Sequence, residues 1–145
     1  MIKSVIKGYG YYVPENVVTN DDLSKLMTTN DEWITERTGI KERRHRKNRN
    51  DSEETTAFLA KKAAEKALEK ANLTAKDLDF IVFATLSPDY FFPGSGVVLQ
   101  EMLGCDTIGA LDVRNQCSGF VYSMSVADAF IKAGTYKNIL VVGAE

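Results

Sequence analysis

Apolar residues gather in three short runs, which are separated by longer segments of mixed polarity. The runs cover residues 80–85, 108–113 and 139–143, and each is mostly apolar from end to end. Short runs without strict alternation are typical of parallel strands that are covered on both faces. The pattern therefore predicts three buried strands.

Three helices are predicted before and between these strands. Ser52 is followed by two glutamates, a typical helix start, and the alanine-rich segment 56–71 has strong helix propensity. Segments 95–103 and 118–133 are each followed by a glycine, as is common at helix C-termini. Strands that alternate with helices predict an α/β fold with a largely parallel sheet.

Shorter elements are predicted in the first 50 residues. Alternation over residues 2–6 predicts a first or edge strand, which ends in a glycine-rich, proline-stopped turn. Thr19 or the residue after it can cap a short helix, and Asn30 can cap a second helix that ends at Gly39. The run 41–51 is almost entirely charged or polar and is expected to be a solvated loop.

The C-terminal end is unusual for a layered fold. The sequence stops at Glu145, directly after an apolar run that would need both faces covered. We therefore expect residues 1–145 to be one domain that belongs to a longer protein.

Composition narrows the class of protein. With 44% hydrophobic residues and a net charge of -2, the chain has the balance of a globular domain and no overall attraction to nucleic acid. It lacks both a long apolar span and a leader pattern, so the sequence predicts a cytoplasmic protein without a membrane segment. Two cysteines and one histidine are too few for a metal cluster, so no metal site is expected.

Cys117 is the main chemical feature. It stands where a buried strand turns into a long helix, and the partial positive charge of a helix N-terminus favours a thiolate. N–H groups of the first helical turn can stabilise an oxyanion, and a thiolate is suited to exchanging acyl groups between thioesters. The alternative is a small buried residue, since free cysteine is often buried. We expect that alternative for Cys105, which does not precede a helix.

Four segments resemble the 3-oxoacyl-[acyl-carrier-protein] synthase III enzymes of the thiolase-like superfamily. They occur in the family's order along the chain, and their combination is more specific than any one of them. The segments are Gly8–Pro14 with Thr19–Leu23, Asp31–Ile34 with Arg37–Arg43, Phe92–Pro93, and Asp112–Val113 with Cys117–Tyr122. The resemblance implies the thiolase-like layered fold, here its N-terminal half only.

The resemblance also implies roles for individual residues. Cys117 would be acylated by an acyl-coenzyme A, while Trp33 and Arg37 would hold the adenine ring and Thr29 would lie near the same nucleotide. Stacking and cation-π attraction suit such a pair four residues apart on a helix. Phe92 would cross the interface of a homodimer and shape the acyl pocket of the partner subunit.

The implied reaction is a decarboxylating Claisen condensation that starts fatty-acid synthesis. An acyl-coenzyme A primer and malonyl-acyl carrier protein would give 3-oxoacyl-acyl carrier protein, with coenzyme A thioester as substrate and no resident cofactor. The family's catalytic histidine and asparagine belong to a second half, and His45 does not match that histidine. The residues Arg114, Asn115 and Gln116 replace small residues of many relatives, so primer specificity is open.

Two other readings of the sequence remain open. The same cysteine could serve another thiolase-like enzyme, such as a hydroxymethylglutaryl-coenzyme A synthase or a polyketide-type starter synthase. Alternatively, the basic run Lys41–Arg49 could make the chain a binding module for nucleic acid or an acidic protein. No stacking aromatic residues interleave this run, which favours a solvated loop.

Overall fold

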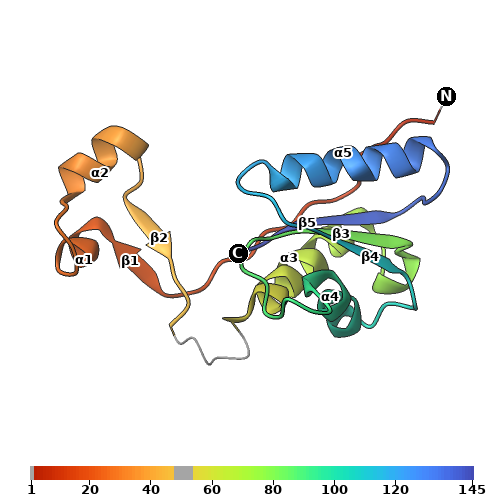
Figure 1. The fold of residues 1–145 in the computed structure, drawn as a ribbon, viewed down its shortest axis with the longest axis horizontal. Coiled ribbons are helices and arrows are strands. Elements are labelled where there is room, and N and C mark those ends of the chain that lie inside the picture. The colour runs from red at the N-terminus through yellow and green to blue at the C-terminus, as the bar shows by residue number, and fades with distance from the viewer. Residues whose placement is uncertain (1, 48–53) are drawn as a thin grey trace. The chain divides into compact units, whose positions relative to one another are not determined.

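The computed structural model describes residues 2–47 and 54–145. The chain divides into two compact units, one made of Met1–Tyr12 with Thr55–Glu145 and the other of Val13–Glu54. Each unit has its own secondary structure, shown in Figure 1. The larger unit carries the parallel sheet that the sequence predicts.

The sheet of the larger unit has three parallel strands in the order β4-β3-β5. The central strand β3 (Phe80–Ala84) pairs with β4 (Gly109–Val113) on one side and with β5 (Ile139–Gly143) on the other. Every residue of β3 is buried, as expected of a strand flanked and covered on all sides. The positions of the three predicted strands and the α/β fold class are confirmed. The expected burial holds only for β3, because no residue of β4 is buried and only Leu140 and Val142 of β5 are.

Helices cover both faces of this sheet (Figure 1). Helices α3 (Thr56–Ala71) and α4 (Ser95–Leu103) lie on one face, and α5 (Gly119–Lys132) lies on the other. A short 3-10 turn, η2 (Ala75–Asp77), joins α3 to β3. The core lies between the sheet and helices α3 and α4. Its fully buried side chains include Ile81, Phe83 and Leu99.

The helix boundaries agree with the sequence patterns, with one change at the start of α3. The side chain of Thr55 accepts a hydrogen bond from the N–H of Phe58, so Thr55 caps this helix. Ser52, the expected start, lies outside the described residues. Helix α4 ends at Gly104 in the left-handed conformation, as predicted.

The segment before residue 13 does not form the predicted strand. Its backbone runs along α3, where a Cβ atom at Gly10 would overlap the carbonyl oxygen of Ala63 and one at Gly8 would overlap that of Ala67. Ile2 and Ile6 remain exposed. The prediction of a strand over residues 2–6 is therefore wrong, because the segment has no strand partner among the described residues.

The smaller unit pairs β1 (Val17–Thr19) with β2 (Glu42–Arg44) in antiparallel fashion. Helix α1 (Asn20–Ser24) is capped by Thr19, and α2 (Asp31–Thr38) by Asn30, with Gly39 ending α2 in the left-handed conformation. These caps are the predicted ones. The expectation of a loop over residues 41–51 is wrong at Glu42–Arg44, which form strand β2.

Asn20 is the buried centre of the smaller unit. Its side-chain amide donates to Asp31 and to the carbonyl of Ile40, and its side-chain oxygen accepts from Arg43 at 2.7 Å. Arg43 also donates to the carbonyl of Val18. These contacts explain why β2 forms within a charged run. The side chain of Arg43 satisfies the Asn20 amide oxygen and the Val18 carbonyl, which the fold removes from water.

Candidate active site

Cys117 lies in the turn between β4 and α5 and is exposed. The chain leaves β4 at Val113 and enters α5 at Gly119, so the predicted strand-to-helix position is confirmed. The N–H of Gly119 already donates to the carbonyl of Gln116 at 2.6 Å. Exposure removes the main argument for a merely structural cysteine, because the side chain fills no space in the core.

Backbone donors remain available beside this thiol. Within the described residues, no hydrogen bond uses the N–H groups of Phe120 and Val121, the second and third residues of α5. Unpaired N–H groups in a first helical turn are suited to stabilising negative charge that develops on a nearby oxygen. The turn thus offers an exposed thiol and free donors within a few residues.

Cys105 has a different environment. It is partly buried, and it packs against the core below α4. Burial raises the pKa of its thiol, which disfavours the thiolate. These properties agree with the expectation that Cys105 is structural.

Trp33 and Arg37 lie one turn apart on α2, and the structure brings them together. The guanidinium carbon of Arg37 is 4.6 Å from the centroid of the indole ring. Both side chains are about half exposed, the indole at 53%. Among the described residues, the guanidinium is held otherwise only by a 3.5 Å bond to the carbonyl of Trp33 and a 3.6 Å pair with Glu36.

Thr29 lies just before the cap of α2. Its hydroxyl oxygen is buried, and no hydrogen-bond partner for it occurs among the described residues. Thr29, Trp33 and Arg37 belong to the smaller unit, whereas Cys117 and Phe92 belong to the larger one.

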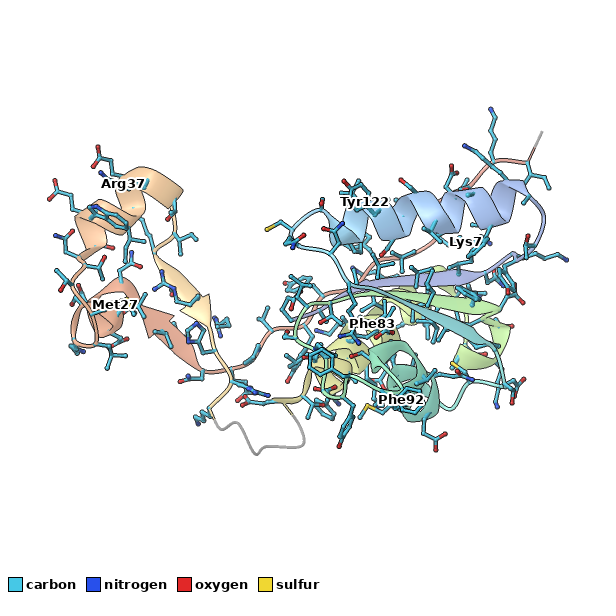
Figure 2. All side chains as sticks on the ribbon, viewed as in Figure 1. Lys7, Met27, Arg37, Phe83, Phe92 and Tyr122 are labelled. Carbon is cyan, nitrogen blue, oxygen red and sulfur yellow. The ribbon has the colours of Figure 1, made fainter. Side chains whose placement is uncertain are left out.

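Phe92 lies in the segment from Leu86 to Gly94, called the aromatic loop below, which joins β3 to α4. Phe91 and Phe92 are 91% and 90% exposed, so neither ring packs into the core (Figure 2). The peptide bond between Phe92 and Pro93 is cis. The loop therefore presents adjacent aromatic rings on the surface of the larger unit.

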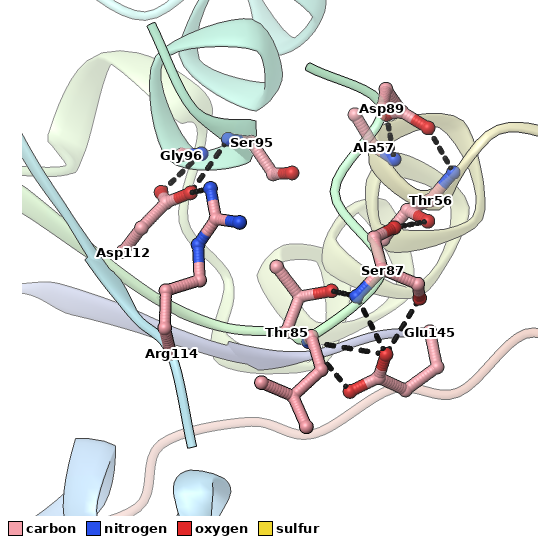
Figure 3. Close-up of polar contacts among 11 residues, drawn as sticks. Thr56, Ala57, Thr85, Ser87, Asp89, Ser95, Gly96, Asp112, Arg114 and Glu145 are labelled. Atoms are coloured by element: carbon pink, nitrogen blue, oxygen red, sulfur yellow. Dashed lines mark hydrogen bonds and ion pairs between the residues drawn. The ribbon is translucent and has the colours of Figure 1, made fainter. Parts of the chain in front are cut away.

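Carboxylates hold the two ends of the aromatic loop (Figure 3). At its end, Asp112 of β4 accepts from the N–H groups of Ser95 and Gly96, both at 2.8 Å. At its start, Glu145 accepts from the N–H of Leu86 and from the N–H and hydroxyl of Ser87.

A third carboxylate ties the loop to α3. Asp89 accepts from the N–H groups of Thr56 and Ala57, both at 2.8 Å, at the start of that helix. The sequence does not indicate the roles of Asp89 and Glu145, since each accepts hydrogen bonds from residues far along the chain. One sequence feature could have indicated Glu145, because it follows an apolar strand directly. The carboxyl ends of parallel strands lie at the same edge of a sheet, so a carboxylate there can reach the loops of neighbouring strands.

The basic run from Lys41 is mostly exposed in its described part, but three of its arginines are tied to the backbone of the smaller unit. Arg43, Arg44 and Arg46 each donate to a backbone carbonyl, those of Val18, Glu15 and Glu54. Arg49 lies outside the described residues. Within residues 2–47 and 54–145, no cluster of three or more His, Cys, Asp or Glu side chains could hold a metal ion. No helix there is long and apolar enough to cross a membrane.

Comparison with known sequences points to one family. A family model described as 3-Oxoacyl-[acyl-carrier-protein (ACP)] synthase III matches residues 111–145. The beta-ketoacyl-[acyl-carrier-protein] synthase III of Aquifex aeolicus is 49% identical over 140 residues, 97% of this chain and 44% of that protein. Its counterpart from Xanthomonas euvesicatoria is 50% identical over 99% of this chain and 43% of that protein. The chain thus spans less than half the length of these curated relatives.

Solved structures with a similar fold come from the same family as the similar sequences. The crystal structure of 3-oxoacyl-[acyl-carrier-protein] synthase III from Aquifex aeolicus superposes with a TM-score of 0.91 and 48% identity over 100% of this chain and 45% of that chain. The Thermus thermophilus enzyme of the same name gives 0.86 at 38% identity, over 97% and 42%. The thiolase-like fold class is confirmed, with the chain matching only part of each structure.

Proposed function

Because the chain has the sequence and fold of the amino-terminal part of 3-oxoacyl-[acyl-carrier-protein] synthase III proteins, we propose that Cys117 is the nucleophile of such an enzyme. The observation that carries the proposal is the exposed thiol at the turn from β4 into α5, beside unpaired N–H groups. The substrates would be an acyl-coenzyme A primer and malonyl-acyl carrier protein.

The proposed reaction has two steps. The thiolate of Cys117 attacks the carbonyl carbon of the acyl-coenzyme A, and coenzyme A leaves as its thiolate when the tetrahedral intermediate collapses. The N–H groups of Phe120 and Val121 can receive the oxyanion of that intermediate. A malonyl thioester then loses CO₂, and the resulting carbanion attacks the acyl-cysteine, which forms the 3-oxoacyl product and frees the thiolate.

The smaller unit would bind the nucleotide of coenzyme A. The guanidinium of Arg37 already lies over the indole ring of Trp33. The weak secondary contacts of Arg37 would let its side chain swing away and admit an adenine ring between them. The unpartnered hydroxyl of Thr29 would be available to a polar atom of the same nucleotide. Coenzyme A thioester is thus a substrate, and no resident cofactor is proposed.

Phe92 is proposed to shape the acyl site of a partner subunit in a homodimer. Its 90% exposure supports a contact outside this chain, since a large apolar side chain gains stability when it is covered. A location in the cytoplasm belongs to the same proposal. These assignments concern the whole protein rather than the 145-residue chain alone.

Mass spectrometry of the longest natural form after incubation with acetyl-coenzyme A tests the nucleophile. We expect about one acetyl group per chain, mapped to the peptide that carries Cys117. Cys117→Ser should abolish the adduct, while Cys105→Ser serves as the matched control and should leave it intact. An acetyl group on Cys105, or none on Cys117, would contradict the proposal.

A further inference from the structure

Asn20 connects helix α2 to the rest of the smaller unit. Its Nδ2 atom donates at 2.7 Å to Oδ1 of Asp31, the first residue of α2, and at 2.8 Å to the carbonyl of Ile40, just beyond the end of the helix. A longer contact of 3.4 Å reaches the hydroxyl of Thr35 within α2. Asn20 is only 1% exposed. One buried amide therefore holds α2 at its start and just beyond its end.

Arg43 fixes the orientation of this amide. Its Nη2 atom donates to Oδ1 of Asn20 at 2.7 Å, and its Nη1 atom donates to the carbonyl of Val18 at 3.2 Å. A guanidinium can only donate, so the amide oxygen must face Arg43 and the amide nitrogen must face the acceptors on Asp31 and Ile40. Among the described residues, Arg43 makes no hydrogen bond to α2. It therefore acts on the helix through Asn20.

Trp33 and Arg37 lie on the opposite side of α2 from these contacts. Successive residues of an α-helix are about 100° apart around the axis, so positions 33 and 37 lie about 200° from positions 31 and 35. The side chains at 31 and 35 contact Asn20, whereas those of Trp33 and Arg37 are half exposed. The buried amide thus holds one face of α2 and leaves the face with the Trp33–Arg37 pair open to a ligand.

We propose that Asn20 is a positioning residue of the nucleotide site, which sets how α2 presents Trp33 and Arg37 and thereby the affinity for coenzyme A. The inference rests on the proposed function of that pair. All three acceptors of the Asn20 amide nitrogen belong to α2 or to the segment just after it, so the buried hydrogen bonds serve the placement of this helix. Asn20 acts from the far face of α2 and does not touch the nucleotide.

Calorimetry of coenzyme A binding to the longest natural form tests the affinity. Asn20→Asp keeps the shape of the side chain, but it sets a carboxylate oxygen against that of Asp31 and removes the donor to Ile40. We expect the dissociation constant to rise roughly tenfold, because both short contacts with the α2 segment are lost. Asn16→Asp is the matched control, since it adds the same charge to the smaller unit at a side chain without a hydrogen bond among the described residues. An increase no larger than that of the control would overturn the proposal.

A shortened acyl donor separates positioning from a general loss of stability. Acetyl-pantetheine carries the thioester of acetyl-coenzyme A but lacks the adenine nucleotide, so it cannot use the Trp33–Arg37 pair. We expect Asn20→Asp to raise KM for Cys117 acylation by acetyl-coenzyme A roughly tenfold without changing kcat. Both constants for acetyl-pantetheine should stay as in wild type. An equal loss with the two donors would show a general structural effect and would overturn the proposal.

Arg43→Lys decides the proposal if Asn20→Asp does not fold. The variant keeps the positive charge, so attraction to the phosphates of coenzyme A is unchanged. A compact ammonium group does not span the two acceptors that the guanidinium reaches, so the Asn20 amide is less firmly oriented. We expect KM for acetyl-coenzyme A to rise roughly threefold, again with no change for acetyl-pantetheine. If Asn20→Asp does not fold, unchanged constants in Arg43→Lys overturn the proposal.

The outcomes separate this inference from the proposed function. If wild-type protein binds coenzyme A but Cys117 is not acylated, the proposed nucleophile is wrong, while calorimetry still decides the role of Asn20. If Arg37→Ala weakens coenzyme A binding and Asn20→Asp does not, the nucleotide site stands and the inference is wrong. If neither variant weakens binding, the nucleotide site on α2 and the inference are both wrong.

Discussion

At the scale of single residues, close approach of backbone segments explains the glycines near the N-terminus. Gly8 and Gly10 lie against carbonyl oxygens of α3, where any side chain would collide. Lys66 of α3 reinforces the contact by donating to the carbonyl of Tyr11. The local sequence instead predicts a glycine bend after a strand, because the close approach of another element leaves no pattern in the neighbouring residues.

Gly10→Ala should destabilise the protein. The new Cβ would overlap the carbonyl oxygen of Ala63, so the segment must move away from α3, at a cost of about 1–3 kcal/mol. Chemical denaturation would measure the change. Gly119→Ala is the control, since its Cβ would meet neighbours at 3.5 and 3.6 Å, which are ordinary contacts. Equal stability of Gly10→Ala and wild type would contradict the packing argument.

Trp33 is the only tryptophan of the 145 residues, and in the longest natural form its fluorescence is identified by comparison with Trp33→Phe. We expect coenzyme A to quench the part of the fluorescence that this variant lacks. Arg37→Ala should raise the dissociation constant by about 5- to 30-fold, the equivalent of a cation-π contact of 1–2 kcal/mol. Arg44→Ala makes the same change of charge on β2 and should leave the affinity unchanged. Quenching that is equally strong in Arg37→Ala would remove Arg37 from the proposed site.

At the scale of elements, carboxylates distant in sequence satisfy the starts of two helices. Asp89 binds the first N–H groups of α3, and Asp112 those of α4. The positive end of a helix dipole stabilises such anions. The sequence revealed local caps such as Thr19 and Asn30, because those contacts span only three residues. Asp89 acts across 33 residues, and no sequence pattern reports that distance.

Asp89→Asn should weaken α3 and the start of the aromatic loop together. An asparagine can accept only one of the two N–H groups, so we expect a loss of about 1–2 kcal/mol in the free energy of unfolding. Thermal denaturation would measure it, and faster hydrogen exchange at Thr56 and Ala57 would locate it. Glu101→Gln on the exposed face of α4 is the control. A loss no larger than that of the control would show that Asp89 does not cap α3.

At the scale of the whole molecule, the larger unit leaves apolar side chains on α5 uncovered. Phe120, Val121 and Tyr122 are 44%, 60% and 52% exposed, although they follow directly on the turn that carries Cys117. Figure 2 labels Tyr122 on α5. The relatives are more than twice as long as this chain, which covers 44% of the Aquifex aeolicus protein. The second catalytic half that the family resemblance implies has no counterpart in the sequence.

The 145-residue chain alone should therefore form no 3-oxoacyl product. It carries the thiol that we propose for acyl uptake, but the histidine and asparagine that the resemblance assigns to decarboxylation are not among its residues. His45 stands in a basic segment beside β2. Mass spectrometric product analysis with acetyl-coenzyme A and malonyl-acyl carrier protein would test this, with the longest natural form as positive control. Product from the short chain would show that condensation needs no second half.

The sequence by itself determined the positions of the three strands, most helix ends and the position of Cys117 at a strand-to-helix turn. These features depend on local periodicity, on capping residues within a turn, and on chain order. Only the tertiary structure decided that the first residues lie along α3 without a strand partner, that a charged run forms β2, and that Asp89, Asp112 and Glu145 hold the aromatic loop. Such contacts join residues far apart in the chain, and which of them form depends on how the elements pack rather than on neighbouring residues.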